Sequence, residues 1–167
     1  MFEPKPITAG GVPGALQKAE RYRLLNEPMA AESICLDILE VEPDNQAALV
    51  MLILARTDQF AEAGGVPAAK ARDVLPRLID DFNRAYYTGV IHERRAKALL
   101  ASGRPGSGSM AYAGFREAME CYEQAEGLST PGNDDARLRW NTCARILNNS
   151  PHLSPRVEEQ FEPMLED

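Results

Sequence analysis

The chain has 167 residues, of which 44% are hydrophobic and 26% charged, and its formal net charge is −7. This composition is typical of a single globular domain and excludes a globally disordered or fibrous protein. The negative charge opposes non-specific binding to nucleic acid or to anionic lipid. Because the chain has no long apolar run, we expect a cytoplasmic protein with no membrane partner.

The cysteines and histidines are few and lie far apart in the chain. The cysteines are Cys35, Cys121 and Cys143, without a Cys-x-x-Cys pair, and the histidines are His92 and His152. This pattern provides neither a disulfide framework nor the ligand set of a zinc site. We therefore expect reduced cysteines that pack as small apolar residues, and no metal or other cofactor.

Helical patterns begin directly after a segment rich in proline and glycine. We expect residues 1–12 to be a flexible N-terminal segment, followed by a first helix within 14–26. A second helix has apolar residues at amphipathic spacing, lies between Pro28 and Pro43, and is followed by a third within 44–58.

The middle of the chain is less regular. Any helix within 65–82 contains Pro76, which removes a backbone hydrogen bond or kinks the helix. Residues 84–101 have a clear helical pattern, and the Gly- and Ser-rich stretch 102–109 predicts a long, flexible connection after it.

Two further helices and a tail complete the chain. We expect helices over 115–128 and 134–149 from the spacing of their apolar residues. The remaining residues, 149–167, are predicted to form an acidic tail with scope for a short helix within 156–165.

Two of the predicted helix pairs share a pattern of small and aromatic residues. In the earlier pair Ala19 and Tyr22 lie on the first helix, Ala31 opens the second and Pro43 closes it. The later pair repeats the second-helix pattern with Phe115, Ala118, Tyr122 and Ala125. These residues resemble the tetratricopeptide (TPR) repeat family, over about residues 13–148.

The resemblance implies an all-α fold. It predicts a TPR-like domain at 13–148, built as a right-handed superhelix of about three tandem helix pairs plus a capping helix. The physical basis of the pattern is that small residues let neighbouring helices approach closely, while the aromatic ring fills the adjoining gap. The match is strong in the first and third units and weak in the second.

No sequence motif predicts an enzyme. The stretch 103–109 lacks the Gly-Lys-Ser/Thr ending of a phosphate-binding loop, and the pair His92-Glu93 has Ala96 where a zinc-protease helix has its second histidine. Because the chain has two histidines, few pairs of a nucleophile with a histidine base are available. We therefore expect a protein without catalytic activity.

A stack of helix pairs forms a concave groove lined by the first helix of each pair. On each of these helices we expect the groove residues to lie one position beyond the core residues. The candidates are Leu16, Glu20 and Arg23, then Val50, Leu54 and Thr57, then Thr88, His92 and Arg95, with Arg137, Arg139 and Arg145 of the last helix. An apolar end and a basic end suit a peptide or helix with an apolar anchor and an acidic segment.

The resemblance implies a protein–protein interaction scaffold whose groove binds a segment of a partner. A secretion-type chaperone or a self-assembling structural protein is an alternative, because a homo-oligomer would stabilise so small a scaffold. A third alternative is a nucleic-acid-binding regulator, in which residues 84–104 and 137–145 form one basic face. We also hypothesise that the acidic tail folds into its own groove or into that of a neighbouring copy.

Overall fold

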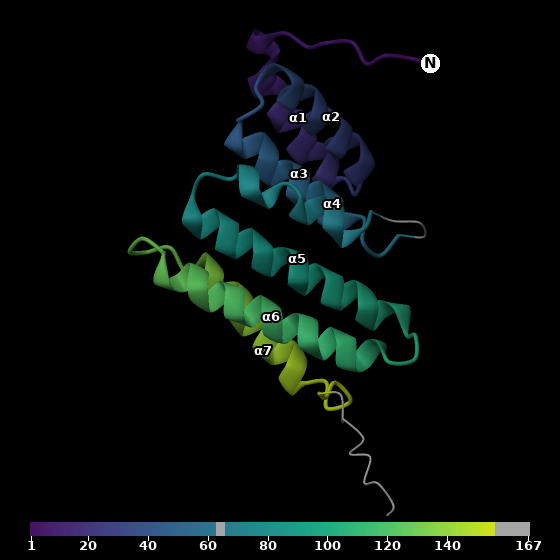
Figure 1. Ribbon diagram of the computed structural model, residues 1–167, viewed down its shortest axis with the longest axis vertical. Coiled ribbons are helices and arrows are strands. Elements are labelled where there is room, and N and C mark those ends of the chain that lie inside the picture. The colour runs from purple at the N-terminus through teal and green to yellow at the C-terminus, as the bar shows by residue number, and fades with distance from the viewer. Residues whose placement is uncertain (63–65, 156–167) are drawn as a thin grey trace, which may run out of the picture.

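The computed structural model describes residues 1–62 and 66–155, in which seven α-helices pack as antiparallel neighbours and no β-strand occurs (Figure 1). None of these helices is long and apolar enough to span a membrane. In chain order they are α1 (Val12–Leu24), α2 (Pro28–Val41), α3 (Gln46–Asp58), α4 (Ala68–Arg72), α5 (Asp81–Ser102), α6 (Ser107–Gly127) and α7 (Asp135–Asn148), with 3₁₀ turns at Ala9–Gly11 and Leu75–Arg77.

The helices enclose two apolar cores, with α1–α4 at one end of the molecule and α5–α7 at the other (Figure 1). Cys35 and Leu49 belong to the first core, and Phe115 to the second. The two cores meet where α3 contacts α5: Ile91 of α5 is part of the first core, and Leu54 of α3 packs against the second. The second core therefore rests on the first through these two helices.

Most residues of the small-and-aromatic pattern lie in the interior. Tyr22 is half-buried, and Pro43 is exposed after α2, where its carbonyl oxygen accepts a hydrogen bond of 2.6 Å from Arg77. The fully buried members are Ala19, Ala31, Phe115, Ala118, Tyr122 and Ala125.

Side-chain caps explain where two of the helices begin. The side chain of Asn45 accepts a 2.9 Å hydrogen bond from the backbone N–H of Ala48 at the start of α3. At the start of α5, the Asp80 carboxylate accepts a 3.2 Å hydrogen bond from the N–H of Asn83. Each bond satisfies an N–H group that has no partner within its helix.

Pro76 limits the helical structure between α3 and α5. Within 66–82 the chain forms the five-residue α4 and then a single 3₁₀ turn, Leu75–Arg77, that contains the proline. A continuous helix as long as α2 or α6 is absent from this described stretch, because proline has no N–H group to donate and clashes with the preceding turn.

The connection between α5 and α6 differs from the long one expected at 102–109. It consists of residues 103–106 alone, and α6 begins at Ser107, eight residues before the predicted start. Gly103 and Gly106 adopt left-handed conformations with φ of 59° and 78°, which glycine reaches without steric penalty and which allow a tight turn. The following Ser-Gly-Ser residues are helical because α6 packs along α5.

Both ends of the described chain contact the cores. In the segment 1–12, Ile7 packs against the first core and Val12 is buried. After α7, Leu153 is buried against the second core. The short helix expected within 156–165 lies outside the described residues.

Gly89 allows α6 to lie close to α5. A Cβ atom at this position would lie 2.6 Å from Cε1 and 2.9 Å from Cδ1 of Tyr122. Tyr122 is fully buried, and its hydroxyl is held by Glu93, so its ring has little freedom to move away. The close packing of α5 and α6 thus depends on Gly89, which has no side chain and faces the large ring of Tyr122.

Replacing Gly89 by alanine is expected to lower the free energy of unfolding by about 1–3 kcal/mol, because the new methyl group overpacks this contact. The matched control is Gly14→Ala in α1, where a Cβ meets nothing within 4 Å. That substitution should be neutral or stabilise by up to about 1 kcal/mol. Urea unfolding measures both, and equal stabilities of the two variants would contradict this packing.

The three cysteines are free, and burial raises the pKa of each thiol, to about 12 for Cys35 and Cys143. Cys35 and Cys143 are fully buried, whereas Cys121 is half-buried. Because the thiolate is the reactive form, an alkylating reagent at about pH 8 should label Cys121 first. Peptide mass spectrometry checks this order, and labelling of Cys35 or Cys143 at the same rate would contradict it.

Candidate functional site

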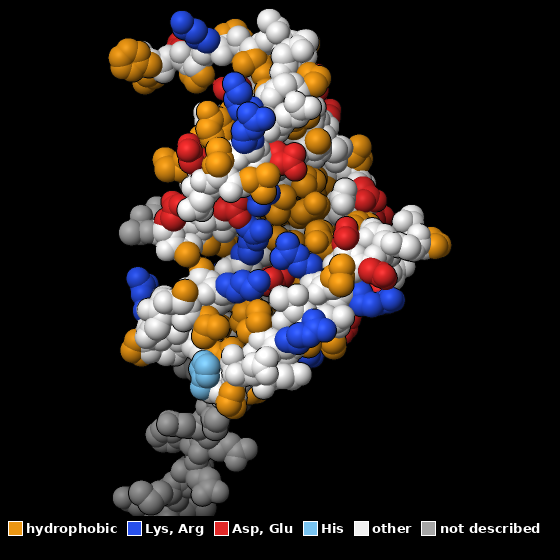
Figure 2. Space-filling model, turned by 180° about the vertical axis from the view of Figure 1, so that it is seen from behind, with side chains coloured by type: hydrophobic (Ala, Val, Ile, Leu, Met, Phe, Trp, Pro, Cys, Tyr) orange, Lys and Arg blue, Asp and Glu red, His pale blue; other side chains and the backbone are white. Residues whose placement is uncertain are grey.

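Basic side chains and two carboxylates from α1, α3, α5 and α7 converge on one side of the molecule. Figure 2 shows Lys and Arg side chains gathered across the middle of the molecule, with carboxylates and apolar side chains between them. We refer to the converging residues as the basic face: Arg23, Asp58, Glu93, Arg94, Lys97 and Arg139.

Asp58, at the end of α3, holds two of these cations. Its Oδ2 accepts a 2.7 Å hydrogen bond from Nε of Arg23 on α1, and its Oδ1 pairs with Arg94 on α5. All three side chains are largely withdrawn from solvent, with relative exposures of 18–23%. The Asp58 carboxylate therefore links α1, α3 and α5.

Glu93, on α5, is completely buried and holds the other two cations. It accepts a 2.6 Å hydrogen bond from the Tyr122 hydroxyl of α6 and pairs with Lys97 one turn along α5. Nη1 of Arg139, from α7, lies 3.3 Å from both carboxylate oxygens. Burial and the neighbouring Glu93 raise the pKa of Tyr122, so this hydroxyl remains a donor.

The basic face carries an excess of positive charge. Four cations share the carboxylates of Asp58 and Glu93 within a protein whose net charge is −7, and the exposed Glu20 is a further carboxylate near Arg23. Burial, together with repulsion by Arg23 and Arg139, lowers the pKa of Arg94 to about 10. The arginines are thus close enough to repel one another, and an added anion would relieve that repulsion.

A hollow of about 430 Å³ opens between these residues. Asp58, Arg94, Lys97 and Arg139 line it together with Phe60 and several small residues. The small residues are Thr57, Ala61, Ala98 and Ala101. Their short side chains leave room over the charged groups, so an incoming anionic side chain has access to the cations.

Large apolar side chains are exposed directly beside two of the arginines in the chain. Leu24 and Leu25 follow Arg23 and are 82% and 61% exposed, and Leu138 precedes Arg139 and is 62% exposed. Adjacent residues of a helix point in different directions, so these leucines are exposed apolar surface at the end of α1 and on α7, outside the lining of the hollow.

The structure places three of the twelve groove candidates on this side: Arg23 and Arg139 in the basic face, and Thr57 in the wall of the hollow. The hydroxyl of Thr57 donates to the carbonyl of Leu54. Leu16 and Val50 pack against the first core and Leu54 against the second. Glu20 is exposed on α1.

The candidates on α5 lie toward α6 instead. Nδ1 of His92 is 2.8 Å from Glu117 of α6, and burial lowers the pKa of His92. The hydroxyl of Thr88 donates to the carbonyl of Arg84, and Arg95 is exposed. These residues and the basic face therefore lie on different sides of α5.

On α7, the candidates other than Arg139 are directed elsewhere. Arg137 is exposed and pairs with Glu126 at 2.5 Å and Asp134 at 3.2 Å. Arg145 is exposed in the last turn of the helix. Three predicted arginines of one helix thus have three different surroundings.

Sequence reasoning did not single out Asp58, Glu93, Arg94 or Lys97 as groove residues. The available signal was the i, i+4 spacing of Glu93 and Lys97, which brings opposite charges together on a helix. That spacing also occurs on ordinary solvated faces, so it does not by itself identify a buried carboxylate.

Among residues 1–62 and 66–155, no cluster of three or more His, Cys, Asp or Glu side chains is arranged to hold a metal ion. Comparison of the chain with protein-family models, with curated proteins and with solved structures finds no match. The assignment of a function therefore depends on the geometry of the basic face.

Replacing Tyr122 by phenylalanine removes one hydrogen bond from the buried Glu93 and should lower the free energy of unfolding by about 1.5–3 kcal/mol. Tyr112→Phe on the same helix is the control, because the half-buried Tyr112 hydroxyl makes no hydrogen bond within the described residues. Thermal or urea unfolding gives both values. An unchanged stability of Tyr122→Phe would mean that Glu93 does not need this donor.

Proposed function

We propose that this protein is a protein–protein interaction scaffold that binds an acidic segment of a partner at the basic face. The observation that carries the proposal is the excess of positive charge over the hollow, on a protein that is otherwise acidic. Ordinary surface arginines would be distributed among the surrounding carboxylates. Here Arg23, Arg94 and Arg139 come from three helices and repel one another.

The arrangement of the helices supports a TPR-like scaffold as part of this proposal. The basic face draws its residues from α1, α3, α5 and α7, the helices that a stack of helix pairs would turn toward its concave side. In this proposal α2, α4 and α6 are the second helices of three pairs in a right-handed superhelix, and α7 caps the stack. The short α4 is then a reduced second helix.

Binding would use cations that are already held in place. Asp58 and Glu93 orient Arg23, Arg94, Lys97 and Arg139, so a partner's carboxylate loses less free energy in ordering them. A guanidinium group can donate two parallel hydrogen bonds to one carboxylate, which favours Asp or Glu on the partner. Apolar residues of the partner would supply affinity, while the positive charges of the basic face would select a negatively charged partner.

A nucleic acid has less support as the ligand. A phosphate backbone would need a continuous basic surface across α5 and α7, but Arg137 is paired with Glu126 and Asp134. The cations of the basic face are also interleaved with Asp58 and Glu93. A short acidic peptide matches this small patch better than an extended polyanion.

Selection of peptides from a random display library against the full chain tests the proposal. The enriched peptides should combine carboxylates with apolar residues. Their affinity should fall about tenfold for the variant Arg94→Gln/Lys97→Gln, because two charge-assisted contacts are lost.

The matched control is Arg72→Gln/Arg116→Gln, which removes two exposed arginines outside the basic face and should leave the affinity unchanged. Circular dichroism confirms that both variants are folded. Enriched peptides without carboxylates, or equal losses in the two variants, would reject the proposal. Retention on heparin that disappears in the Arg94→Gln/Lys97→Gln variant, without peptide binding, would favour a nucleic-acid ligand instead.

A further inference from the structure

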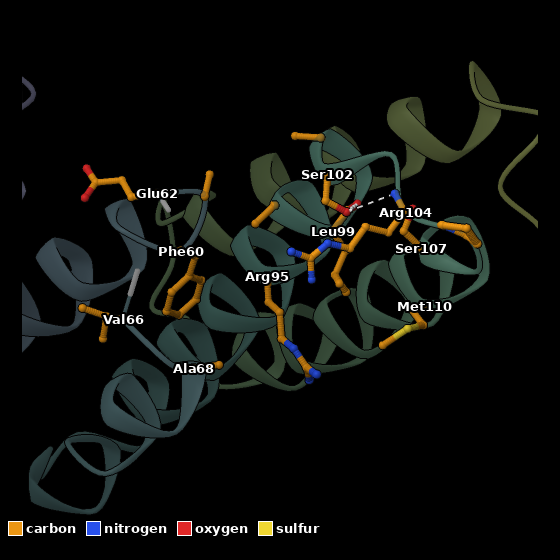
Figure 3. Close-up of a pocket in the computed structure, with 14 residues that line it drawn as sticks. Phe60, Glu62, Val66, Ala68, Arg95, Leu99, Ser102, Arg104, Ser107 and Met110 are labelled. Atoms are coloured by element: carbon orange, nitrogen blue, oxygen red, sulfur yellow. Dashed lines mark hydrogen bonds between the residues drawn. The ribbon is translucent and has the colours of Figure 1, made fainter. Parts of the chain in front are cut away.

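A second recess adjoins the hollow and lies beside the turn from α5 to α6 (Figure 3); Phe60, Ala61, Ala98 and Ala101 line both. We call it the turn cleft; its volume is about 640 Å³. It lies between the end of α5, the start of α6 and the chain around α4. Its apolar walls and its two cations are provided by Phe60, Val66, Leu99, Met110, Arg95 and Arg104.

The two arginines of the turn cleft differ from those of the basic face. Arg95 and Arg104 are exposed, and neither forms an ion pair within residues 1–62 and 66–155. Glu62 lies at the rim, with its carboxylate directed away from both guanidinium groups in Figure 3. The cleft therefore offers two cations beside apolar walls without a carboxylate between them.

The first turn of α6 adds polar groups to the same place. The Ser107 side chain lines the cleft, is 8% exposed, and makes no hydrogen bond with the described residues. The N–H of Ser107 donates to the carbonyl of Arg104, so its hydroxyl is the polar group that it offers to the cleft. Ser107 together with Arg95 and Arg104 thus forms a set of groups that suits a carboxylate.

The last described residues lie near the first turn of α6. Residues 150–155 return from α7 to the start of α6, where Leu153 is buried. The carbonyl oxygen of His152 and Cδ2 of Leu153 lie 3.7 Å from the position of a Cβ on Gly108. Gly108 directly follows Ser107, so residues 152–153 lie beside the first turn of α6, whose Ser107 lines the turn cleft.

The segment that follows has matching chemistry. Residues 156–167, RVEEQFEPMLED, contain five carboxylates and one arginine, and their apolar side chains include Phe161, Met164 and Leu165. Twelve residues can extend about 40 Å, at roughly 3.3 Å per residue. Both the reach from the start of α6 and the combination of acidic and apolar side chains therefore fit the turn cleft.

We propose that residues 156–167 dock in the turn cleft of their own chain. Carboxylates of the segment pair with Arg95 and Arg104, and its apolar side chains pack against Phe60, Leu99 and Met110. The turn cleft is favoured over the basic face for this segment because residues 152–153 lie beside the first turn of α6, whose Ser107 lines the cleft. The inference uses other cations than the proposed function, since Arg95 and Arg104 do not line the hollow, although the two recesses share the wall formed by Phe60, Ala61, Ala98 and Ala101.

Cleavage of the full-length chain by a glutamate-specific protease tests the docking, since the segment contains Glu158, Glu159, Glu162 and Glu166. Docking should slow cleavage at these sites. In the variant Arg95→Glu/Arg104→Glu the rate should rise about three- to tenfold, because two exposed ion pairs become repulsive contacts. The milder Arg95→Gln/Arg104→Gln should change the rate in the same direction.

The control variant Lys18→Glu/Arg21→Glu makes the same change of net charge at exposed positions of α1 and should leave the cleavage rate unchanged. Circular dichroism verifies that the helices are intact in each variant. Equal rates in the wild-type chain and Arg95→Glu/Arg104→Glu would overturn the proposal. Protection that increases with protein concentration would assign the segment to a second copy and overturn docking within one chain.

The basic-face variant Arg94→Gln/Lys97→Gln separates this inference from the proposed function. Its segment should be cleaved at the wild-type rate while its affinity for the selected peptides falls about tenfold. If its segment instead became as susceptible as in Arg95→Glu/Arg104→Glu, the segment would occupy the basic face, and docking in the turn cleft would be rejected.

Discussion

The burial of the Glu93 carboxylate constrains much of this structure. Removing a charged carboxylate from water costs several kcal/mol unless donors replace the lost hydration. The donors come from three helices: Lys97 of α5, Tyr122 of α6 and Arg139 of α7. The positions of α6 and α7 against α5 are therefore tied to one side chain. Gly89 belongs to the same constraint, because the ring of Tyr122 lies over Gly89 when its hydroxyl reaches Glu93.

The same constraint determines what the surface can offer to a partner. Arg139 and Lys97 are held near the hollow because they neutralise Glu93, and Arg23 and Arg94 are held there by Asp58. Two carboxylates cannot neutralise four cations, so the stabilising network leaves positive charge at the surface. A structural role of these residues and a binding role are compatible, since the ion pairs order the side chains that a ligand would contact.

Most of the helices could be predicted from the sequence because the periodicity of its apolar residues is strong. Regions where the structure differs have identifiable causes. The stretch 102–109 looked like a long loop because Gly and Ser have low helix propensity, yet Ser107, Gly108 and Ser109 are helical under the packing of α6 on α5. The buried charges were harder to foresee, because a glutamate beside a lysine is common on solvated helices.

The sequence by itself determined an all-α chain and its interior small residues, because the spacing of apolar side chains on a helix decides which face is buried. Ala31, Ala118 and Tyr122, which the pattern of small and aromatic residues singled out, are all buried. Only the tertiary structure decided that Glu93 lies in the interior and Arg95 on the opposite side of α5 from the basic face. The rotation of α5 about its axis is set by contacts with α3, α6 and α7, which are distant in sequence and involve ion pairs rather than a repeating apolar pattern.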